Sequence, residues 1–258
     1  MFANERQNKI FEIIKTKGAV TTNELIQIFG VSIETVRRDL LSMEKDGKLN
    51  RVHGGAVAKS EMKPFLDLSS RNKEYEKEKS ALSIKATEFI REGDIIALDT
   101  GSTAIIFASV LKEYFSNLTI VTHSLDVFNI LAHHKNFSVI LTGGHFLKEE
   151  NAFYGSLAIK TIENLNIQKS FIFPSAVSLR GGVCDYEKNL FSVQEYMLKS
   201  ADEVYILADS SKFEKKALLK VSDTSQNFIY VTDNGISNEI LDLYKDNGLS
   251  IYTGGNND

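Results

Sequence analysis

Residues 19–57, AVTTNELIQIFGVSIETVRRDLLSMEKDGKLNRVHGGAV, restrict the fold more than any other segment of this chain. Thr21 or Thr22 can cap a short amphipathic helix, which Gly30 ends in a tight turn. Ser32 then caps a second helix. Two helices joined by a glycine turn are typical of the helix-turn-helix motif, whose second helix enters the DNA major groove. An apolar pattern over residues 5–16 predicts a further helix before them.

The second helix of the motif is predicted to have one buried face and one polar face. Val36, Leu40 and Met43 recur at helical spacing and form the inward stripe. Asp39 lies toward the same side, so we assign it a structural role in a pair with a nearby arginine. The remaining polar residues face outward, where DNA could be read.

A two-stranded wing is predicted after this helix, because residues 48–57 alternate polar and apolar side chains. Arg51, His53 and Gly54 of the wing can approach the phosphate backbone or the minor groove. Arg37 and Arg38 are the best candidates for base or phosphate contacts. The full set of candidate DNA contacts is Thr22, Ser32, Glu34, Thr35, Arg37, Arg38, Lys45, Arg51, His53 and Gly54. The alternative, a helical hairpin with a solvated arginine pair, is disfavoured by the wing.

The segment VSIETVRRDLLSMEKDGKLNRVHGGA resembles the winged helix of the DeoR family of bacterial transcriptional regulators almost residue for residue. The resemblance includes the V-S-x-x-T-V-R-R-D-L core and the H-G-G-A exit. It implies a DNA-binding regulator whose partner is double-stranded operator DNA.

The chain of 258 residues is long enough for a winged helix and one substantial α/β domain. We expect a DNA-binding domain over residues 1–57, a linker over 58–74 and an effector-sensing and oligomerisation domain over 75–258. No apolar run has the roughly 18 residues of a membrane helix, and the N-terminus shows no signal peptide pattern. A single cysteine, Cys184, fits a reducing compartment. These features predict a cytoplasmic protein.

Charge is divided unevenly between the two parts of the chain. Residues 1–60 hold ten Lys or Arg against seven Asp or Glu, a net charge of +3, whereas residues 61–258 hold twenty against twenty-seven, a net charge of −7. The basic excess lies with the DNA-binding motif. Because an excess of three is modest, we expect a homodimer or homotetramer that presents two winged helices to the operator.

The second part of the chain alternates between strand and helix patterns. Strands are predicted at residues 95–98, 118–121, 138–141, 170–173, 204–208 and 228–231, and helices at 74–92, 102–112 and 125–132. The charge run over residues 74–79 is interpreted as a solvated helix face. The alternation predicts a mostly parallel sheet with helices on both faces, whose ligands bind beyond the carboxyl ends of the strands.

Small, hydroxylated and charged residues follow the predicted strands. After the first strand, a D-T-G-S-T turn opens a helix, so backbone N–H groups and the hydroxyls of Ser102 and Thr103 could converge on an anion. A simple capped turn is the equally weighted alternative. The candidate effector-binding residues are Asp99, Thr100, Gly101, Ser102, Thr103, Thr122, His123, Ser124, Gly143, Gly144, Asp209 and Lys212.

These loops resemble the C-terminal domain of the same DeoR family, so the resemblance covers essentially the whole chain. It implies a fold similar to ribose-5-phosphate isomerase that binds a phosphorylated sugar. By this analogy the residues Gly101, Ser102 and Thr103 hold the phosphate, Lys212 supplies a cation, and Asp99 or Asp209 orients sugar hydroxyls.

The chain departs from the family pattern at several positions near this pocket, including residues 171–176, FIFPSA, where many members have a Gly-containing F-x-G-A segment. His123 stands where the family usually has Asn, and Leu190 and Gln194 stand where many members carry Glu and Lys. The loss of these two charges argues against isomerase chemistry, which needs a placed carboxylate base. The histidines lack metal-ligand spacing, no G-x-S-x-G elbow occurs, and we expect no cofactor.

The leading interpretation is a transcriptional regulator, a repressor of a carbohydrate catabolism operon, controlled by a phosphorylated sugar at the C-terminal domain. One alternative is an active sugar-phosphate isomerase or acyl-transferring enzyme fused to a DNA-binding module. Another is a constitutive DNA-binding protein whose second domain only oligomerises. Turnover assays and ligand-induced thermal shifts would separate them.

Overall fold

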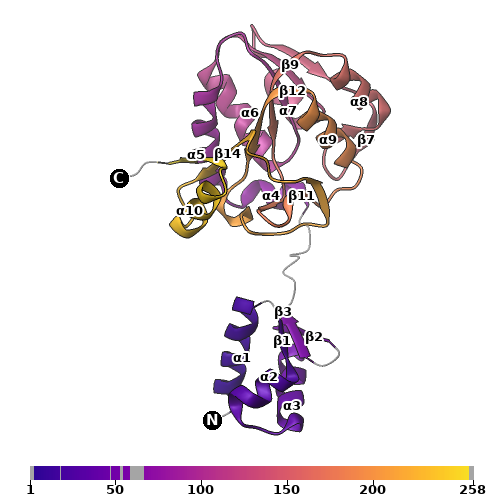
Figure 1. Cartoon of the computed structure of the whole chain (residues 1–258). Coiled ribbons are helices and arrows are strands. Elements are labelled where there is room, and N and C mark those ends of the chain that lie inside the picture. Colours follow the sequence, from indigo (N-terminus) through magenta and orange to yellow (C-terminus); the bar gives the residue numbers. More distant parts are fainter. Residues whose placement is uncertain (1–2, 18, 47, 53–54, 59–66, 256–258) are drawn as a thin grey trace. The chain divides into compact units, whose positions relative to one another are not determined.

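The computed structural model divides the chain into two compact units, residues 1–64 and 65–258 (Figure 1). The structure describes residues 3–17, 19–46, 48–52, 55–58 and 67–255. The stretch expected to be a linker, residues 58–74, includes a short helix, α4 (Leu68–Lys73), which packs on α6 of the second unit. Asp67 caps α4 by accepting a hydrogen bond from the Ser70 amide at 2.9 Å.

The first unit is a winged helix. Its elements are α1 (Ala3–Lys17), β1 (Ala19–Thr21), α2 (Thr22–Phe29), α3 (Ile33–Lys45), β2 (Leu49–Val52) and β3 (Gly55–Ala58). The wing contains the two expected strands, and β1 joins them to give an antiparallel sheet in the order β1-β3-β2. The stripe of Val36, Leu40 and Met43 is buried in the core of this unit, as its spacing predicts.

The ends of the two motif helices follow from their capping residues. Thr21 begins α2 in a capping box with Glu24, and Gly30 ends it with a φ of 62° in the left-handed region. Ser32 begins α3 and accepts a hydrogen bond from the Thr35 amide. The predicted helix boundaries are therefore confirmed, with Thr21 rather than Thr22 as the cap.

A buried ion pair joins α1 to α3. Asp39 Oδ2 lies 2.5 Å from Arg6 Nε, and the two side chains are only 5% and 9% exposed. The guanidinium also donates to Asp39 Oδ1 at 3.1 Å. The predicted structural role of Asp39 is confirmed, with its arginine partner on α1.

The second unit is a mostly parallel α/β domain, as expected. Its main sheet has seven parallel strands in the order β15-β14-β12-β9-β4-β5-β6. These strands are β4 (Ile95–Leu98), β5 (Thr119–Thr122), β6 (Ser138–Leu141), β9 (Ile167–Ile172), β12 (Ala201–Leu207), β14 (Phe228–Asp233) and β15 (Ser250–Gly254). The six predicted strands are all present, and β15 is an additional edge strand.

Helices cover both faces of this sheet. One core contains side chains of α5 (Glu76–Ala86), α6 (Ser102–Tyr114) and α7 (Leu125–Leu131). The other core contains side chains of α8 (Ser156–Glu163), α9 (Phe191–Lys199) and α10 (Asn238–Asp246). The smaller elements are β7 (His145–Leu147), β8 (Ala152–Tyr154), β10 (Ala176–Ser178), β11 (Gly182–Asp185), β13 (Leu219–Ser222), η1 (Thr87–Phe89) and η2 (Ser210–Lys212).

The helix predicted over residues 74–92 is shorter than expected, since α5 ends at Ala86 and the turn η1 follows. The interpretation of residues 74–79 as a solvated helix face is wrong at Lys79, because this residue is only 2% exposed. The Lys79 ammonium donates hydrogen bonds to the carbonyls of Arg71 and Glu74, both at 2.6 Å. These carbonyls end α4, so Lys79 holds α4 against α5 instead of facing solvent.

Candidate effector cleft and DNA-binding surface

The second unit has a cleft at the point where its strand order reverses, and we call it the switch-point cleft. From β4 the chain runs outward through β5 and β6, then returns to β9 on the other side of β4 and runs outward through β12, β14 and β15. The crevice beyond the carboxyl ends of two such strands is where open α/β sheets bind ligands. The cleft there is narrow, with a volume of about 10 Å³, and is lined by Arg71, Thr100, Gly101, Glu150, Phe173, Ser175, Asp185, Glu187, Leu190 and Gln194.

The turn after β4 places a helix N-terminus at this cleft. Gly101 is the N-cap of α6 with a φ of 119°, a conformation that favours glycine. No side chain caps α6 among the described residues, so the first amides of the helix lack the usual side-chain acceptor. Thr100 and Gly101 line the cleft, whereas Ser102 and Thr103 are each only 4% exposed.

Buried polar groups form a network behind the turn. Asp99 is fully buried; its Oδ1 lies 2.8 Å from Nε2 of His123, and its Oδ2 accepts from Gln194 Nε2 at 3.1 Å. Gln194 Nε2 also donates to Asp185 Oδ2 at 2.8 Å. Burial raises the pKa of Asp185, although its hydrogen bonds with Gln194 and Ser175 oppose that rise. One neutral amide therefore bridges two buried carboxyl groups.

Several other predicted effector residues have local structural contacts. Thr122 donates to the Leu98 carbonyl at 2.9 Å, and Ser124 caps α7. A Cβ at Gly144 would lie 2.4 Å from the Tyr154 carbonyl oxygen, so the close approach of β8 requires glycine there. Gly143, before it, also has a positive φ, of 68°. These four residues are not among the lining of the cleft.

The loop after β12 carries the remaining two predicted residues. Asp209 Oδ1 accepts from the Ser211 amide at 3.2 Å, and its buried Oδ2 has no hydrogen-bond partner in the described part of the chain. Burial, and after it the positive charge of Lys212, lower the pKa of Lys79 to about 8. Asp209 partly offsets this effect.

The charged residues that line the cleft were not predicted from the sequence. Arg71 Nη2 contacts both carboxylate oxygens of Glu150, at 2.5 and 2.6 Å, and the Glu150 side chain is 4% exposed. Thr100 also donates to the Glu150 carbonyl at 3.3 Å. Asp185 and Glu187 were missed as well. Leu190 and Gln194, where the resemblance leads us to expect charges, do line the cleft.

The first unit presents polar residues of α3 to solvent. Arg37, Arg38 and Lys45 are exposed, and Arg37 makes an exposed ion pair with Glu34 at 3.2 Å. Ser32 bonds the Thr35 hydroxyl at 3.0 Å. Of the other candidates, Thr22 is half-buried and Arg51 is exposed, whereas His53 and Gly54 lie outside the described residues.

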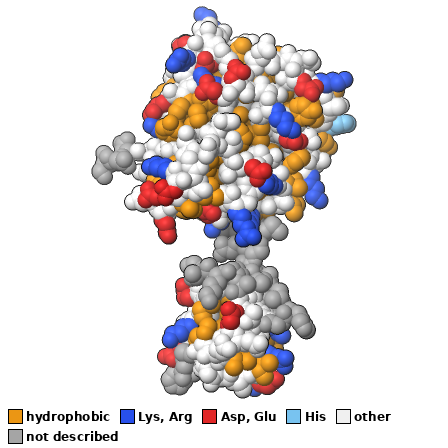
Figure 2. Space-filling model, viewed as in Figure 1, with side chains coloured by type: hydrophobic (Ala, Val, Ile, Leu, Met, Phe, Trp, Pro, Cys, Tyr) orange, Lys and Arg blue, Asp and Glu red, His pale blue; other side chains and the backbone are white. Residues whose placement is uncertain are grey.

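Apolar side chains also reach this surface. Ile33 and Leu41 of α3 are 41% and 40% exposed, and Ile28 of α2 is 52% exposed. On the face shown in Figure 2, hydrophobic side chains and Lys or Arg side chains lie close together on the first unit. Such apolar groups suit contacts with thymine methyl groups. These residues carry no charge, so the pattern of polar residues on α3 did not predict them as DNA contacts.

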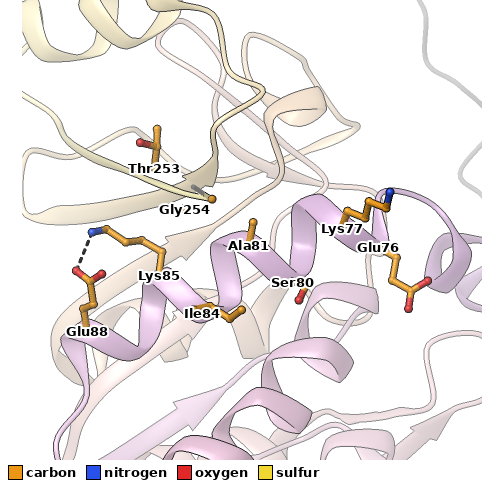
Figure 3. Close-up of a pocket in the computed structure, with 10 residues that line it drawn as sticks. Glu76, Lys77, Ser80, Ala81, Ile84, Lys85, Glu88, Thr253 and Gly254 are labelled. Atoms are coloured by element: carbon orange, nitrogen blue, oxygen red, sulfur yellow. Dashed lines mark hydrogen bonds and ion pairs between the residues drawn. The ribbon is translucent and has the colours of Figure 1, made fainter. Parts of the chain in front are cut away.

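A second pocket, an open groove, lies on the surface between α5 and the end of β15 (Figure 3). Its side chains include the ion pair of Lys85 and Glu88, whose charged atoms are 2.7 Å apart, and the exposed Ile84. A Cβ at Gly254 would lie 2.2 Å from the Ala81 carbonyl oxygen, so glycine lets β15 pass close to α5. None of the predicted effector residues lines this groove.

No group of three or more His, Cys, Asp or Glu among the described residues could hold a metal ion. None of the described helices is long and apolar enough to cross a bilayer.

A winged helix with an exposed polar α3, joined in one chain to an α/β unit with a switch-point cleft, defines a DNA-binding protein of the regulator class. Comparison with known proteins identifies the family. Residues 6–62 match the DeoR-like helix-turn-helix domain, and residues 74–234 match the DeoR C terminal sensor domain. The chain belongs to the DeoR family of transcriptional regulators.

Relatives of known name match along nearly the whole chain. The lactose phosphotransferase system repressor of Lactococcus lactis subsp. lactis is 32% identical over 246 residues, 95% of this chain and 96% of that protein. The uncharacterized HTH-type transcriptional regulator YulB of Bacillus subtilis is 31% identical over 97% of this chain and 96% of its own length. The putative aga operon transcriptional repressor of Escherichia coli O157:H7 is 27% identical over 96% and 93%.

Among solved structures, a D-ribose-5-phosphate isomerase in complex with phospho-erythronic acid gives a TM-score of 0.40 at 17% identity, with 54% of each chain covered. The family assignment depends on the sequence matches and not on this distant likeness.

Proposed function

We propose that this regulator represses a carbohydrate catabolism operon and that a phosphorylated sugar bound in the switch-point cleft changes its affinity for operator DNA. The proposal rests on the lining of the cleft. The N-terminus of α6, which no side chain caps, meets Arg71 there, and the polar side chains of Ser175 and Gln194 could bind sugar hydroxyls. The names of two relatives, a lactose phosphotransferase system repressor and a putative aga operon repressor, support a sugar-related role.

The mechanism needs only a difference in effector affinity between two assemblies. If the effector favours an assembly whose winged helices are wrongly spaced for two half-sites, DNA binding weakens. A coupling free energy of about 1 to 3 kcal/mol changes operator affinity by roughly 5 to 150-fold. We propose a homodimer or homotetramer that acts in the cytoplasm, with α3 in the major groove and Arg37 and Arg38 as its principal contacts.

Electrophoretic mobility shifts with the promoter of its own or a neighbouring operon test this proposal, with and without a panel of sugar phosphates. We expect specific binding that one sugar phosphate alters. The proposal fails if no promoter fragment is bound specifically under any condition.

The enzymatic alternative is tested on the same full chain. We expect sugar phosphates to bind without turnover, because the buried carboxyl groups of Asp99 and Asp185 both accept hydrogen bonds from Gln194. Conversion of a sugar phosphate at a rate that Asp99→Asn abolishes would favour the enzyme instead.

A further inference from the structure

The charge of the switch-point cleft limits how an anion could bind there. Of the ten described residues that line the cleft, Arg71 is the one cation, and Glu150, Asp185 and Glu187 are acidic. Where the family resemblance leads us to expect a lysine, the chain has the neutral Gln194. An anionic group in this cleft therefore depends on Arg71 for its counter-charge.

Arg71 is already placed beside the uncapped helix N-terminus. A Cβ built on Gly101, the N-cap of α6, would lie 3.9 Å from Arg71 Nη1, while Nη2 of the same guanidinium holds Glu150. The guanidinium thus spans the Gly101 turn and the carboxylate. A helix N-terminus and an arginine fork are both groups that bind a tetrahedral oxyanion.

A second observation points to a ligand in the same cleft. Gln194 is 2% exposed and lines the cleft. Its Nε2 is satisfied by Asp99 and Asp185, but its buried Oε1 has no hydrogen-bond partner among the described residues. Buried amide oxygens are normally paired, so this one calls for a donor such as a sugar hydroxyl.

We propose that Arg71 binds the anionic group of the effector against the N-terminus of α6, and that the anion takes this guanidinium from Glu150. This inference rests on the proposed function. It adds that Arg71 neutralises the anion and that the Glu150 carboxylate competes with the anion for Arg71. Glu150 loses its counter-ion in this exchange and takes up a proton from solvent. The raised pKa of Glu150, caused chiefly by burial, is consistent with such a proton uptake.

Arg71, whose partner changes in this exchange, lies on α4, the first described element of the second unit. The backbone carbonyls of Arg71 and Glu74 are held by Lys79, and the side chain of Arg71 is held by Glu150. Exchange of Glu150 for an anion therefore removes one contact that holds α4, the helix that follows residues 59–66. This position suits a residue that reports ligand binding toward the DNA-binding unit.

Calorimetric titration of the full chain with inorganic phosphate tests the exchange. We expect Glu150→Gln to bind phosphate at least about tenfold more tightly than the wild type, because it removes the competing carboxylate. The double variant Arg71→Gln/Glu150→Gln carries no buried unpaired charge and so is the matched control for folding. It should bind phosphate at least about tenfold more weakly than Glu150→Gln.

A second titration uses sulfate, a dianion that does not itself titrate near neutral pH. Heats measured in two buffers of different ionisation enthalpy should show uptake of about one proton by the wild type and none by Glu150→Gln. A purely structural Arg71–Glu150 pair would give equal phosphate affinity for the wild type, Glu150→Gln and the double variant, and that result overturns the proposal. Failure of the wild type to bind either anion overturns it as well, whereas the proposed function is judged separately by promoter binding and its response to sugar phosphates.

Discussion

The imidazole of His123 lies between two hydrogen-bond acceptors, since Nε2 is 2.8 Å from Asp99 Oδ1 and Nδ1 is 3.0 Å from the Phe153 carbonyl oxygen. A neutral imidazole carries one N–H and can donate to only one of them. The ring thus links the buried Asp99 carboxyl group to the backbone of β8.

Replacing His123 with Ala should weaken the second unit. The change leaves Asp99 Oδ1 buried without its donor, and the free energy of unfolding should fall by about 1 to 3 kcal/mol. Urea denaturation followed by tyrosine fluorescence measures this selectively, because all nine tyrosines lie at position 75 or later. His133→Ala, at an exposed residue, is the control and should change stability by less than about 0.5 kcal/mol. Equal stability of the two variants would contradict the role given to His123.

Arg37→Ala should weaken specific operator binding by roughly 5- to 150-fold and leave the fold intact. Arg37 is 59% exposed on α3, and its one described contact is the exposed ion pair with Glu34, so its removal costs little stability. Loss of a bidentate base contact costs about 1 to 3 kcal/mol of specific binding. Competitive mobility shifts against nonspecific DNA measure the loss. Lys9→Ala, at an exposed residue of α1, should reduce specific binding much less, and equal losses for the two variants would show that Arg37 supplies only general positive charge.

Local sequence patterns predicted most of the main elements, because the relevant physics is short-range. The caps at Thr21 and Ser32 and the left-handed Gly30 depend on neighbours within a few residues, and each was readable from the sequence. The strands of the main sheet were recognisable as short apolar runs between turns. The edge strand β15 was not, because exposed Tyr252 interrupts its apolar pattern.

The candidate cleft was less readable, since its charged residues meet only in the folded chain. Arg71 and Glu150 are 79 positions apart, and neither follows a strand of the main sheet. Lys79 lies within a run of alternating charges that is typical of a solvated helix, yet it is buried because α4 supplies two carbonyl acceptors. The turn residues Thr100 and Gly101 were found because they directly follow β4.

Lys79 should make the stability of the second unit depend on pH. Its pKa is lowered to about 8 in the folded chain, chiefly by burial, and lies near 10.4 when unfolded. A depressed folded pKa contributes stability that is present above the unfolded pKa and lost as pH falls through about 8. The unfolding free energy of the wild type, relative to Lys79→Met, should therefore rise by about 1 kcal/mol between roughly pH 7 and 9.

Urea denaturation followed by circular dichroism measures this difference without relying on tyrosine signals at alkaline pH. Lys85→Met is the matched control, because Lys85 lies on the same helix in an ion pair with Glu88 at the open groove. Its difference from the wild type should stay flat over the same range. A flat difference for Lys79→Met would show that the ammonium is not penalised by burial.

Gln194→Leu should destabilise the second unit, and more strongly at higher pH. The variant loses the amide that donates to both Asp99 and Asp185, which should cost about 2 to 4 kcal/mol at neutral to alkaline pH. Burial already raises the pKa of Asp185 and the Gln194 hydrogen bond lowers it, so the variant raises this pKa further. A raised folded pKa of a carboxyl group gives stability that is present at low pH and lost as pH rises through the folded pKa.

The difference in unfolding free energy between the wild type and Gln194→Leu, measured by urea denaturation with tyrosine fluorescence, should therefore widen from pH 5 to pH 8. Gln27→Leu, at an exposed residue of α2, should show no such trend. An equal difference in unfolding free energy at both pH values would mean that the Gln194 amide does not stabilise the ionised form of Asp185.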